Sequence, residues 1–426
     1  MVPGADELTL AMVRTFLDRV HLATPGQLPE VVLESARTLG WTAVLHVVDY
    51  EQRLLVPAPP MGMHPCRPQA VDTTLAGRCF RTVQPVTASG EGRGVWIPVV
   101  DGADRLGVLE VSAPGGIDLD DATDAERCRL LGHLTGHLIA AKRPYGDALD
   151  RLKRRRERTV ASELLQQLLP PLTFACDGLV LSGFLQPCYD VAADAFDYSV
   201  VDDTAHLAVL DATGHDLRGT VLAAVALSAY RNRRRQGHDL TGSAAAMDEH
   251  VGAHSNGERF ATGVLAELDL PTGRLRYLNA GHPAPLLMRE GRVVKELSGG
   301  VRILFGLGDG HAPVAEEALE PGDWIVCYTD GITEARGRDG EFFGLDRLVE
   351  HLERSASARL PTPETLRRIS HDVLDHQGGV LQDDATLLIA EWSTGGEHTL
   401  LSTGTGGIAG EDLSPSPVDG EDVPRR

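Results

Sequence analysis

The spacing of apolar side chains in the first third of the chain predicts a small sheet flanked by helices. Apolar residues recur at helical spacing over residues 8–17, 28–39 and 122–141, and at strand spacing over 41–48, 94–100 and 106–111. The last two strands are separated by the turn-forming sequence Asp101-Gly-Ala-Asp104. Helices around a hairpin-rich sheet indicate an α+β domain, which we assign to residues 1–141.

A helical linker is predicted to follow, over residues 142–172. Residues 148–169 carry apolar side chains near one stripe, and Pro170-Pro171 ends the helix. The stripe consists of Leu149, Leu152, Val160, Leu164 and Leu168. The basic run Arg151-Leu-Lys-Arg-Arg-Arg156 lies within it. Either a solvated helix face or a short parallel coiled coil between two copies explains this pattern, and the stripe is too short to choose between them.

The remaining folded part is predicted over residues 173–393 and is rich in short strands. Strand patterns occur at 207–210, 263–269, 275–278, 285–288, 323–328 and 385–391, and helical patterns at 219–235, 242–253 and 344–355. The last segment, residues 394–426, is dominated by Gly, Ser, Thr, Pro and acidic residues. We expect this tail to be disordered.

Composition restricts the classes of function. The chain has 426 residues and is 42% hydrophobic, which is enough for two or three folded domains. A net charge of -21 argues against nucleic acid as the main partner. The six cysteines include no C-x-x-C pair, so no zinc knuckle is indicated. Without a leader or a long apolar run, the sequence predicts a cytoplasmic protein that does not bind membranes.

Four aspartates in four separate motifs carry the clearest chemistry. Asp194, Asp211, Asp330 and Asp383 each lie beside an apolar strand pattern or a glycine turn. Any one of them could be a turn residue or a solvated strand entry. As a set within one domain, they predict a shared cleft that binds a hard divalent cation. Oxygen ligands without a His or Cys cluster favour Mg²⁺ or Mn²⁺ over zinc.

The order of these motifs resembles the metal-dependent serine/threonine protein phosphatases of PPM type, in their SpoIIE/RsbU-like branch. The matching motifs are Leu165-Gln-Gln-Leu-Leu-Pro170, Val191-Ala-Ala-Asp-Ala-Phe-Asp197, Leu210-Asp-Ala-Thr-Gly-His215, Tyr277-Leu-Asn-Ala-Gly-His-Pro283, Tyr328-Thr-Asp-Gly-Ile-Thr-Glu334 and Asp383-Asp-Ala-Thr386. The first domain resembles a GAF sensory domain, through residues 74–85 and the predicted strand pair at 95–110. The resemblance implies a phosphatase β-sandwich flanked by helices, joined by the linker to a GAF-like sensor.

The same resemblance implies a site with two Mn²⁺ or Mg²⁺ ions. Asp194 and Asp211 would lie between the metals, and the carbonyl of Ala212 would face one of them. Asp330 and Asp383 would bind the other metal, with Asp384 as the alternative to Asp383. The metals would activate a bridging water for attack on phosphorus, so no protein nucleophile is required.

The sequence departs from the branch pattern at two places near this site. Ala192-Ala193 replaces a pair of glycines, and Asp216 replaces the last glycine of Gly-His-Gly. Asp197 is a second-rank candidate, either supporting a neighbouring helix or binding a metal weakly. Arg218 and Arg231 are candidates for gripping phosphate only because they follow the Asp211 segment.

Four histidines carry weaker hypotheses. His215 could help to position water or phosphate, although a hydrogen bond that stabilises the turn explains it equally well. His282 is expected to be structural near the cleft. His133 and His137 share one helix face, but no third ligand for a metal is evident.

By resemblance, the substrate would be a phosphoserine or phosphothreonine regulator of the anti-sigma-factor antagonist type. We hypothesise that a ligand or partner of the sensor reorients the helical linker within a homodimer and moves a switch helix near Phe196 and Asp197. Two alternatives remain open. The chain could be a catalytically silent scaffold that binds such a regulator, or a hydrolase of small phosphate esters.

Overall fold

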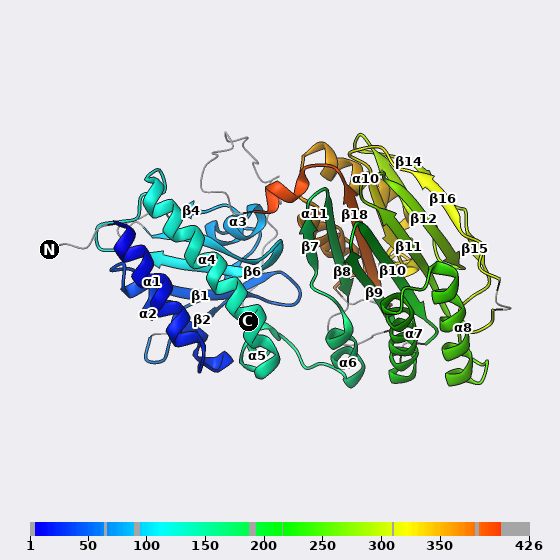
Figure 1. Ribbon diagram of the computed structural model, residues 1–426, viewed down its shortest axis with the longest axis horizontal. Coiled ribbons are helices and arrows are strands. Elements are labelled where there is room, and N and C mark those ends of the chain that lie inside the picture. The colour runs from blue at the N-terminus through cyan, green and yellow to red at the C-terminus, as the bar shows by residue number, and fades with distance from the viewer. Residues whose placement is uncertain are drawn as a thin grey trace.

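The computed structural model describes residues 5–63, 66–88, 94–186, 193–214, 216–308, 311–379 and 383–401. Figure 1 shows an N-terminal unit in blue and cyan beside a second unit that runs from green to orange. Within the described ranges, no helix is both long and apolar enough to cross a membrane.

The N-terminal unit is a six-stranded antiparallel sheet in the order β3-β2-β1-β6-β5-β4. Its strands are β1 (Thr42–Val48), β2 (Leu54–Ala58), β3 (Gln69–Ala70), β4 (Val86–Thr87), β5 (Val95–Asp101) and β6 (Asp104–Ser112). Three helices, α1 (Ala5–Val20), α2 (Leu28–Arg37) and α4 (Ala122–Lys142), share one apolar core with the sheet. A smaller cluster joins α3 (Leu75–Thr82) to the sheet. The predicted helices and strands are confirmed, whereas the GAF-like identity of this unit stays a prediction.

Helix α4 approaches strand β5 closely because two small residues face the strand. A Cβ atom at Gly132 would lie 2.4 Å from the carbonyl oxygen of Pro98, and one at Gly136 would lie 1.8 Å from that of Val100. Real Cβ atoms do not come this close to backbone oxygens, so both positions require glycine at this helix–sheet distance.

The continuous linker helix expected over residues 148–169 is wrong. The chain forms α5 (Ala148–Lys153) and α6 (Val160–Leu168), and Arg154 between them is extended, with ψ 126°. The Thr159 side chain caps α6 by accepting a hydrogen bond from the Ser162 amide at 3.1 Å. The apolar stripe divides, because Leu149 joins the N-terminal core and Leu165 joins the core of the second unit.

The second unit contains two six-stranded sheets packed face to face. The first has the order β15-β12-β11-β10-β9, with β16 beside β12, and the second has the order β14-β13-β17-β18-β8-β7. The first sheet contains β9 (Asp194–Val201), β10 (Thr204–Ala212), β11 (Ala261–Asp269), β12 (Arg274–Ala280), β15 (Val301–Arg302) and β16 (Ala315–Ala318). The second contains β7 (Thr173–Cys176), β8 (Leu179–Gln186), β13 (Leu286–Arg289), β14 (Arg292–Glu296), β17 (Trp324–Tyr328) and β18 (Ala385–Trp392).

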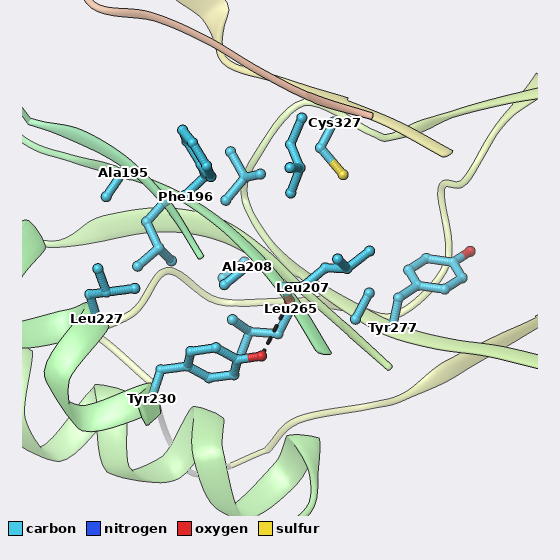
Figure 2. Packing of buried hydrophobic residues seen from close by; sticks show 14 of the residues in the cluster. Ala195, Phe196, Leu207, Ala208, Leu227, Tyr230, Leu265, Tyr277 and Cys327 are labelled. Carbon is cyan, nitrogen blue, oxygen red and sulfur yellow. Dashed lines mark hydrogen bonds between the residues drawn. The ribbon is translucent and has the colours of Figure 1, made fainter. Parts of the chain in front are cut away.

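Helices cover the outer faces of this sandwich. Helices α7 (Leu217–Arg235) and α8 (Leu240–Ser255) share an apolar cluster with the first sheet, and part of that cluster is drawn in Figure 2. The short α9 (Asp330–Thr333), α10 (Gly344–Ser357) and α11 (Thr362–His376) pack against the second sheet. This arrangement confirms the predicted sandwich of mixed α and β structure.

The chain remains ordered a little beyond the predicted end of the second unit. Residues 396–400 form a short 3₁₀ helix, η3 (Gly396–Leu400), and Leu400 packs against Ala103 and Val180. The disorder expected from residue 394 is therefore wrong for residues 394–401, and the rest of the predicted tail lies outside the described residues.

Candidate metal centre

Polar side chains line up across one end of the first sheet. In the antiparallel register, Asp194 on β9 lies directly opposite Asp211 on β10, and Asp211 lies opposite Thr262 on β11. Side chains that are directly opposite on neighbouring strands share a face and are close together. The register therefore brings together two of the predicted site residues, and adds a threonine that the sequence analysis did not single out.

The carboxylate of Asp194 links the two sheets. Its Oδ2 accepts hydrogen bonds from Thr329 Oγ1 at 2.7 Å and from Thr386 Oγ1 at 2.8 Å. Thr329 precedes Asp330 at the end of β17, and Thr386 lies near the start of β18, close after Asp383. Because of these two bonds, the first-sheet aspartates lie beside the second-sheet segments that carry the other two.

The two adjacent aspartates before β18 have different environments. Asp384 is buried, and its Oδ2 accepts from the backbone amides of Ala193 at 2.5 Å and Asp194 at 3.3 Å. Asp383 is exposed. The Asp384 carboxylate is thus engaged in holding the start of β9, which favours Asp383 as the metal ligand of the pair.

Gly331 allows Asp330 to approach this segment. A Cβ atom at Gly331 would lie 1.8 Å from the carbonyl oxygen of Asp384, so only glycine permits this backbone contact. The Asp-Gly sequence at 330–331 opens α9, and Gly331 is required for close packing next to the predicted metal ligand Asp330.

The acids raise one another's pKa values. Burial, followed by the charges of Asp330, Asp383 and Asp384, raises the pKa of Asp211 to about 7. Burial and the charges of Asp211 and Asp384 raise the pKa of Asp194 well above its usual range. Burial and the charge of Asp383 also raise the pKa of Asp330. All four predicted aspartates therefore belong to one concentration of negative charge.

Residues 201–393 match the sequence family described as Stage II sporulation protein E (SpoIIE). The matched segment includes Asp211, Asp330 and Asp383, while Asp194 lies just before it.

Residues 201–393 form a SpoIIE-family domain.

Relatives of this SpoIIE-family domain occur in several bacteria. Protein IcfG of Synechocystis is 30% identical over 137 residues, which cover 32% of this chain and 21% of IcfG. Phosphoserine phosphatase RsbU of Bacillus subtilis is 22% identical over 237 residues, which cover 55% of this chain and 69% of RsbU. The chain thus spans about a fifth of the first relative. Among solved structures, the SiaA-PP2C domain of Pseudomonas aeruginosa is 24% identical, with a TM-score of 0.45, over 60% of this chain and 99% of that chain.

The chemistry of the acidic side chains in the SpoIIE-family domain fits divalent cations. The ligands on offer are carboxylate oxygens, which Mg²⁺ and Mn²⁺ prefer, and the raised pKa values show negative charge that a cation would offset. Nevertheless, no three His, Cys, Asp or Glu side chains in the described ranges form a group that could hold a metal ion. The acids converge without forming a complete metal cage.

The structure gives a physical reason for one departure from the branch pattern, Asp216, and places another, Ala193, beside the start of α7. The Ala193 methyl group packs toward Gly219 at the start of α7, where an added Cβ would lie 3.3 Å from it. Asp216 caps α7, because its Oδ1 accepts from the Gly219 amide at 3.0 Å, and it also pairs with Arg259 at 3.1 Å. Ala192 lies outside the described residues.

Asp197 lies away from the metal centre in an ion-pair network. It is buried and binds Arg231 at 2.7 Å and Arg234 at 2.8 Å. Arg231 also donates to the carbonyl of Leu168 at the end of α6. Of the two hypotheses for Asp197, these contacts favour support of a helix over weak metal binding. They also occupy Arg231, which argues against its role in gripping phosphate.

His282 links the strand next to Asp211 with a tightly closed turn. Its Nδ1 lies 2.8 Å from Thr262 Oγ1, and its backbone N–H and carbonyl are both bonded to the Asn279 side chain, at 2.8 and 2.9 Å. These contacts agree with the structural role expected for His282 near the cleft. His215 lies outside the described residues. His137 belongs to the N-terminal unit, where its ring pairs with Asp101 of the same unit.

Sequence reasoning did not identify Thr262, Thr329 and Thr386. Thr329 and Thr386 each lie next to or close after a predicted metal aspartate, within motifs that the sequence analysis quoted. A β-branched residue in a strand such as Thr386, or a threonine before a helix such as Thr329, is the ordinary case, so neither threonine stood out. Only the packing of the two sheets shows that both hydroxyl groups face Asp194.

Proposed function

We propose that the chain is a metal-dependent protein serine/threonine phosphatase. The observation that carries the proposal is the convergence of Asp194, Asp211, Asp330 and Asp383 from two sheets at one end of a SpoIIE-family domain. The similarity to a relative named as a phosphoserine phosphatase supports the same reaction class.

Two Mn²⁺ or Mg²⁺ ions would be held by these aspartates. Asp194, Asp211 and the carbonyl of Ala212 would contribute ligands from the first sheet, and Asp330 and Asp383 from the second. When bound, the ions supply an activated water for attack on phosphorus and neutralise the charge that develops on the phosphoryl oxygens.

The protein's own groups have supporting tasks in this reaction. The Thr329 and Thr386 hydroxyls hold the Asp194 carboxylate in one orientation, and Asp384 holds the backbone that carries it. A cysteine nucleophile near the site is not favoured, because burial raises the pKa of the nearby Cys327 thiol to about 12. A water nucleophile fits this set of residues better.

The proposed substrate is a phosphoserine or phosphothreonine on a regulator of the anti-sigma-factor antagonist type. Support comes from the SpoIIE-family match and from the similarity to RsbU. A homodimer, a cytoplasmic location and a ligand for the N-terminal unit remain predictions from the sequence.

A catalytically silent scaffold is the second candidate. It is motivated by the departures from the branch pattern at Ala192-Ala193 and Asp216, beside the predicted metal ligands. Such a protein would bind a phosphorylated regulator and release it unchanged.

Hydrolysis of p-nitrophenyl phosphate with Mn²⁺ and with EDTA separates the two candidates. For the enzyme, we expect Mn²⁺-dependent turnover that falls to the EDTA level in Asp211→Asn and in Asp330→Asn. Asp203→Asn is the matched control, because this exposed aspartate lies in the β9–β10 turn, at the end of the hairpin remote from Asp211. If the unmodified chain shows no turnover but binds a phosphorylated regulator, the scaffold is correct.

A further inference from the structure

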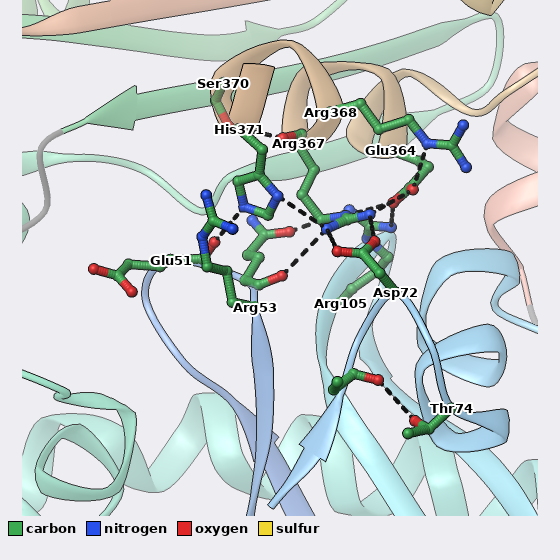
Figure 3. Close-up of polar contacts among 12 residues, drawn as sticks. Glu51, Arg53, Asp72, Thr74, Arg105, Glu364, Arg367, Arg368, Ser370 and His371 are labelled. Atoms are coloured by element: carbon green, nitrogen blue, oxygen red, sulfur yellow. Dashed lines mark hydrogen bonds and ion pairs between the residues drawn. The ribbon is translucent and has the colours of Figure 1, made fainter. Parts of the chain in front are cut away.

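The N-terminal unit and the SpoIIE-family domain meet at a polar contact that the catalytic proposal does not use. On one side are the β1–β2 turn, the residue Asp72 after β3, and Arg105 at the start of β6. On the other side is α11, on the outer face of the second sheet. Figure 3 shows how side chains from both units interlock there.

Glu364 and Arg367 lie at the centre of this contact, one turn apart on α11. Their exposed fractions are 2% and 1%. The Glu364 carboxylate accepts from Arg367 Nε at 2.8 Å and from Arg368 Nε at 2.9 Å, both on its own helix. It also pairs with the buried Arg105 of the N-terminal unit, at 3.5 Å.

Further bonds cross between the units in both directions. Arg367 Nη2 lies 2.5 Å from Asp72 Oδ1, and the His371 ring lies 2.8 Å from the carbonyl oxygen of Glu51. Nearer the end of α11, Arg53 pairs with Asp375 at 3.3 Å. The contact is therefore spread along most of one helix face.

Little apolar surface accompanies these charges. Among the described residues, the large apolar clusters each close within one unit, and a small cluster that spans both units contains Ala103, Val180 and Leu400, with Ala175 packed against it. If the units separate, Glu364 keeps Arg367 and Arg368 as partners. Arg105 loses the Glu364 carboxylate and keeps its hydrogen bond to Gln52 Oε1 at 3.3 Å. Polar interfaces of this kind between domains of one chain permit relative motion.

Helix α11 connects this contact to the candidate metal centre through strand β18. Ile369 and Val373 of α11 share an apolar cluster with Leu387 and Ile389 of β18. Strand β18 begins immediately after Asp383-Asp384. By contrast, the linker is broken between α5 and α6, so a rigid helix between the units is not available to carry the signal.

We propose that α11 is a docking surface for the chain's own N-terminal unit, and that release of this contact is how the N-terminal unit acts on the phosphatase domain. The docking itself is independent of the catalytic proposal. Its effect on turnover rests on the proposed function.

Charge reversal on the N-terminal unit tests the docking. In Asp72→Arg, a second cation would face Arg367, and in Arg105→Glu, a second carboxylate would face Glu364. Asp72 is half exposed, so Asp72→Arg keeps the test valid if Arg105→Glu impairs folding. Asp18→Arg is the matched control, because it makes the same charge change at an exposed position on α1.

Amide hydrogen exchange and small-angle X-ray scattering of the full chain report the state of the contact. We expect about tenfold faster exchange in residues 49–53 and along α11, equivalent to the loss of about 1.4 kcal/mol of docking free energy. The radius of gyration should increase in the variant and stay unchanged in Asp18→Arg. Unchanged exchange and scattering in Asp72→Arg would overturn the docking proposal.

Turnover of p-nitrophenyl phosphate over a Mn²⁺ titration tests the regulatory step on the same proteins. Release should shift the Mn²⁺ concentration that gives half-maximal turnover. If the units separate while the titration stays the same, the contact is reversible but does not regulate, and that step is wrong. If the unmodified chain has no turnover at all, the proposed function fails, whereas the exchange and scattering data still decide the docking.

Discussion

At the scale of single residues, the position of the Asp194 carboxylate depends on hydroxyl groups from the opposite sheet. Thr329 and Thr386 both donate to the same oxygen atom, and Asp384 fixes the backbone of Asp194. Burial without these bonds would make ionisation of Asp194 still less favourable, because each bond stabilises the charged form. A proposed metal ligand is thus oriented by neighbours that are not proposed as ligands.

Thr386→Val should therefore weaken metal binding without changing any predicted ligand. Valine keeps the shape but removes one donor to Asp194, and we expect the Mn²⁺ affinity to fall by about 10-fold, the lower end of such effects. The variant should also lose about 1 kcal/mol of unfolding free energy through the lost hydrogen bond, because Thr329 still donates to the same oxygen. Calorimetric Mn²⁺ titration and urea unfolding measure the two effects. Thr386→Ser, which keeps the hydroxyl, should stay close to the unmodified chain, and an equal loss in both variants would contradict this explanation.

At the scale of elements, helix starts and close contacts account for residues that look exceptional in the sequence. Asp216, in place of the usual glycine, caps α7 and pairs with Arg259. Gly132 and Gly136 allow α4 to lie against β5. Each choice satisfies a local packing or hydrogen-bonding requirement of one helix.

Asp216→Ala should lower the urea midpoint of unfolding, because the Gly219 amide at the start of α7 loses its acceptor. Asp216→Asn retains a capping oxygen and should lose less, although it removes the ion pair with Arg259. The order of the two midpoints is the measurement. A midpoint for Asp216→Asn at or below that of Asp216→Ala would show that the ion pair matters more than the cap.

Gly136→Ala should destabilise the N-terminal unit by about 1–3 kcal/mol, because the added methyl group forces α4 away from β5. Thermal or urea unfolding measures the loss. Gly115→Ala is the control, since an added Cβ there has no atom within 4 Å. Equal stability of the two variants would mean that α4 moves without cost.

At the scale of the whole molecule, two units with separate apolar clusters are joined by a charged contact. Burial alone would raise the pKa of Glu364. Hydrogen bonds and ion pairs with Arg367 and Arg105 outweigh burial and lower this pKa to about 2. Since the folded pKa lies below the ordinary value of 4.5, this carboxylate stabilises the folded chain fully above about pH 4.5. That contribution is lost as the pH falls from about 4.5 toward 2.

Glu364→Gln should remove this part of the acid sensitivity. The unfolding free energy of the unmodified chain should fall more steeply than that of the variant between pH 4.5 and 2, by an amount on the order of 3 kcal/mol in total. Chemical unfolding at a series of pH values measures both slopes. Parallel slopes would show that Glu364 titrates normally, and that the contact between the units is weaker than its geometry suggests.

The sequence by itself determined many of the helices and strands and the set of acids, because these depend on local patterns. Periodicity predicted α7, α8, α10, the strand that carries Asp211 and the strand that precedes Asp330. Strand ends with adjacent aspartates predicted a metal centre. The motif order also led to the phosphatase family that the SpoIIE match supports. The helix α11 was not predicted.

Contacts between distant segments were decided only by the tertiary structure. No local pattern reveals that Thr329 and Thr386 meet Asp194, or that Asp384 rather than Asp383 binds the start of β9. The apolar stripe of the linker matches a single helix. In the structure its two ends pack in different cores, and the helix is interrupted between them. The physical reason is the same in each case, because burial and pairing with residues far along the chain outweigh the weak local preference of a short segment.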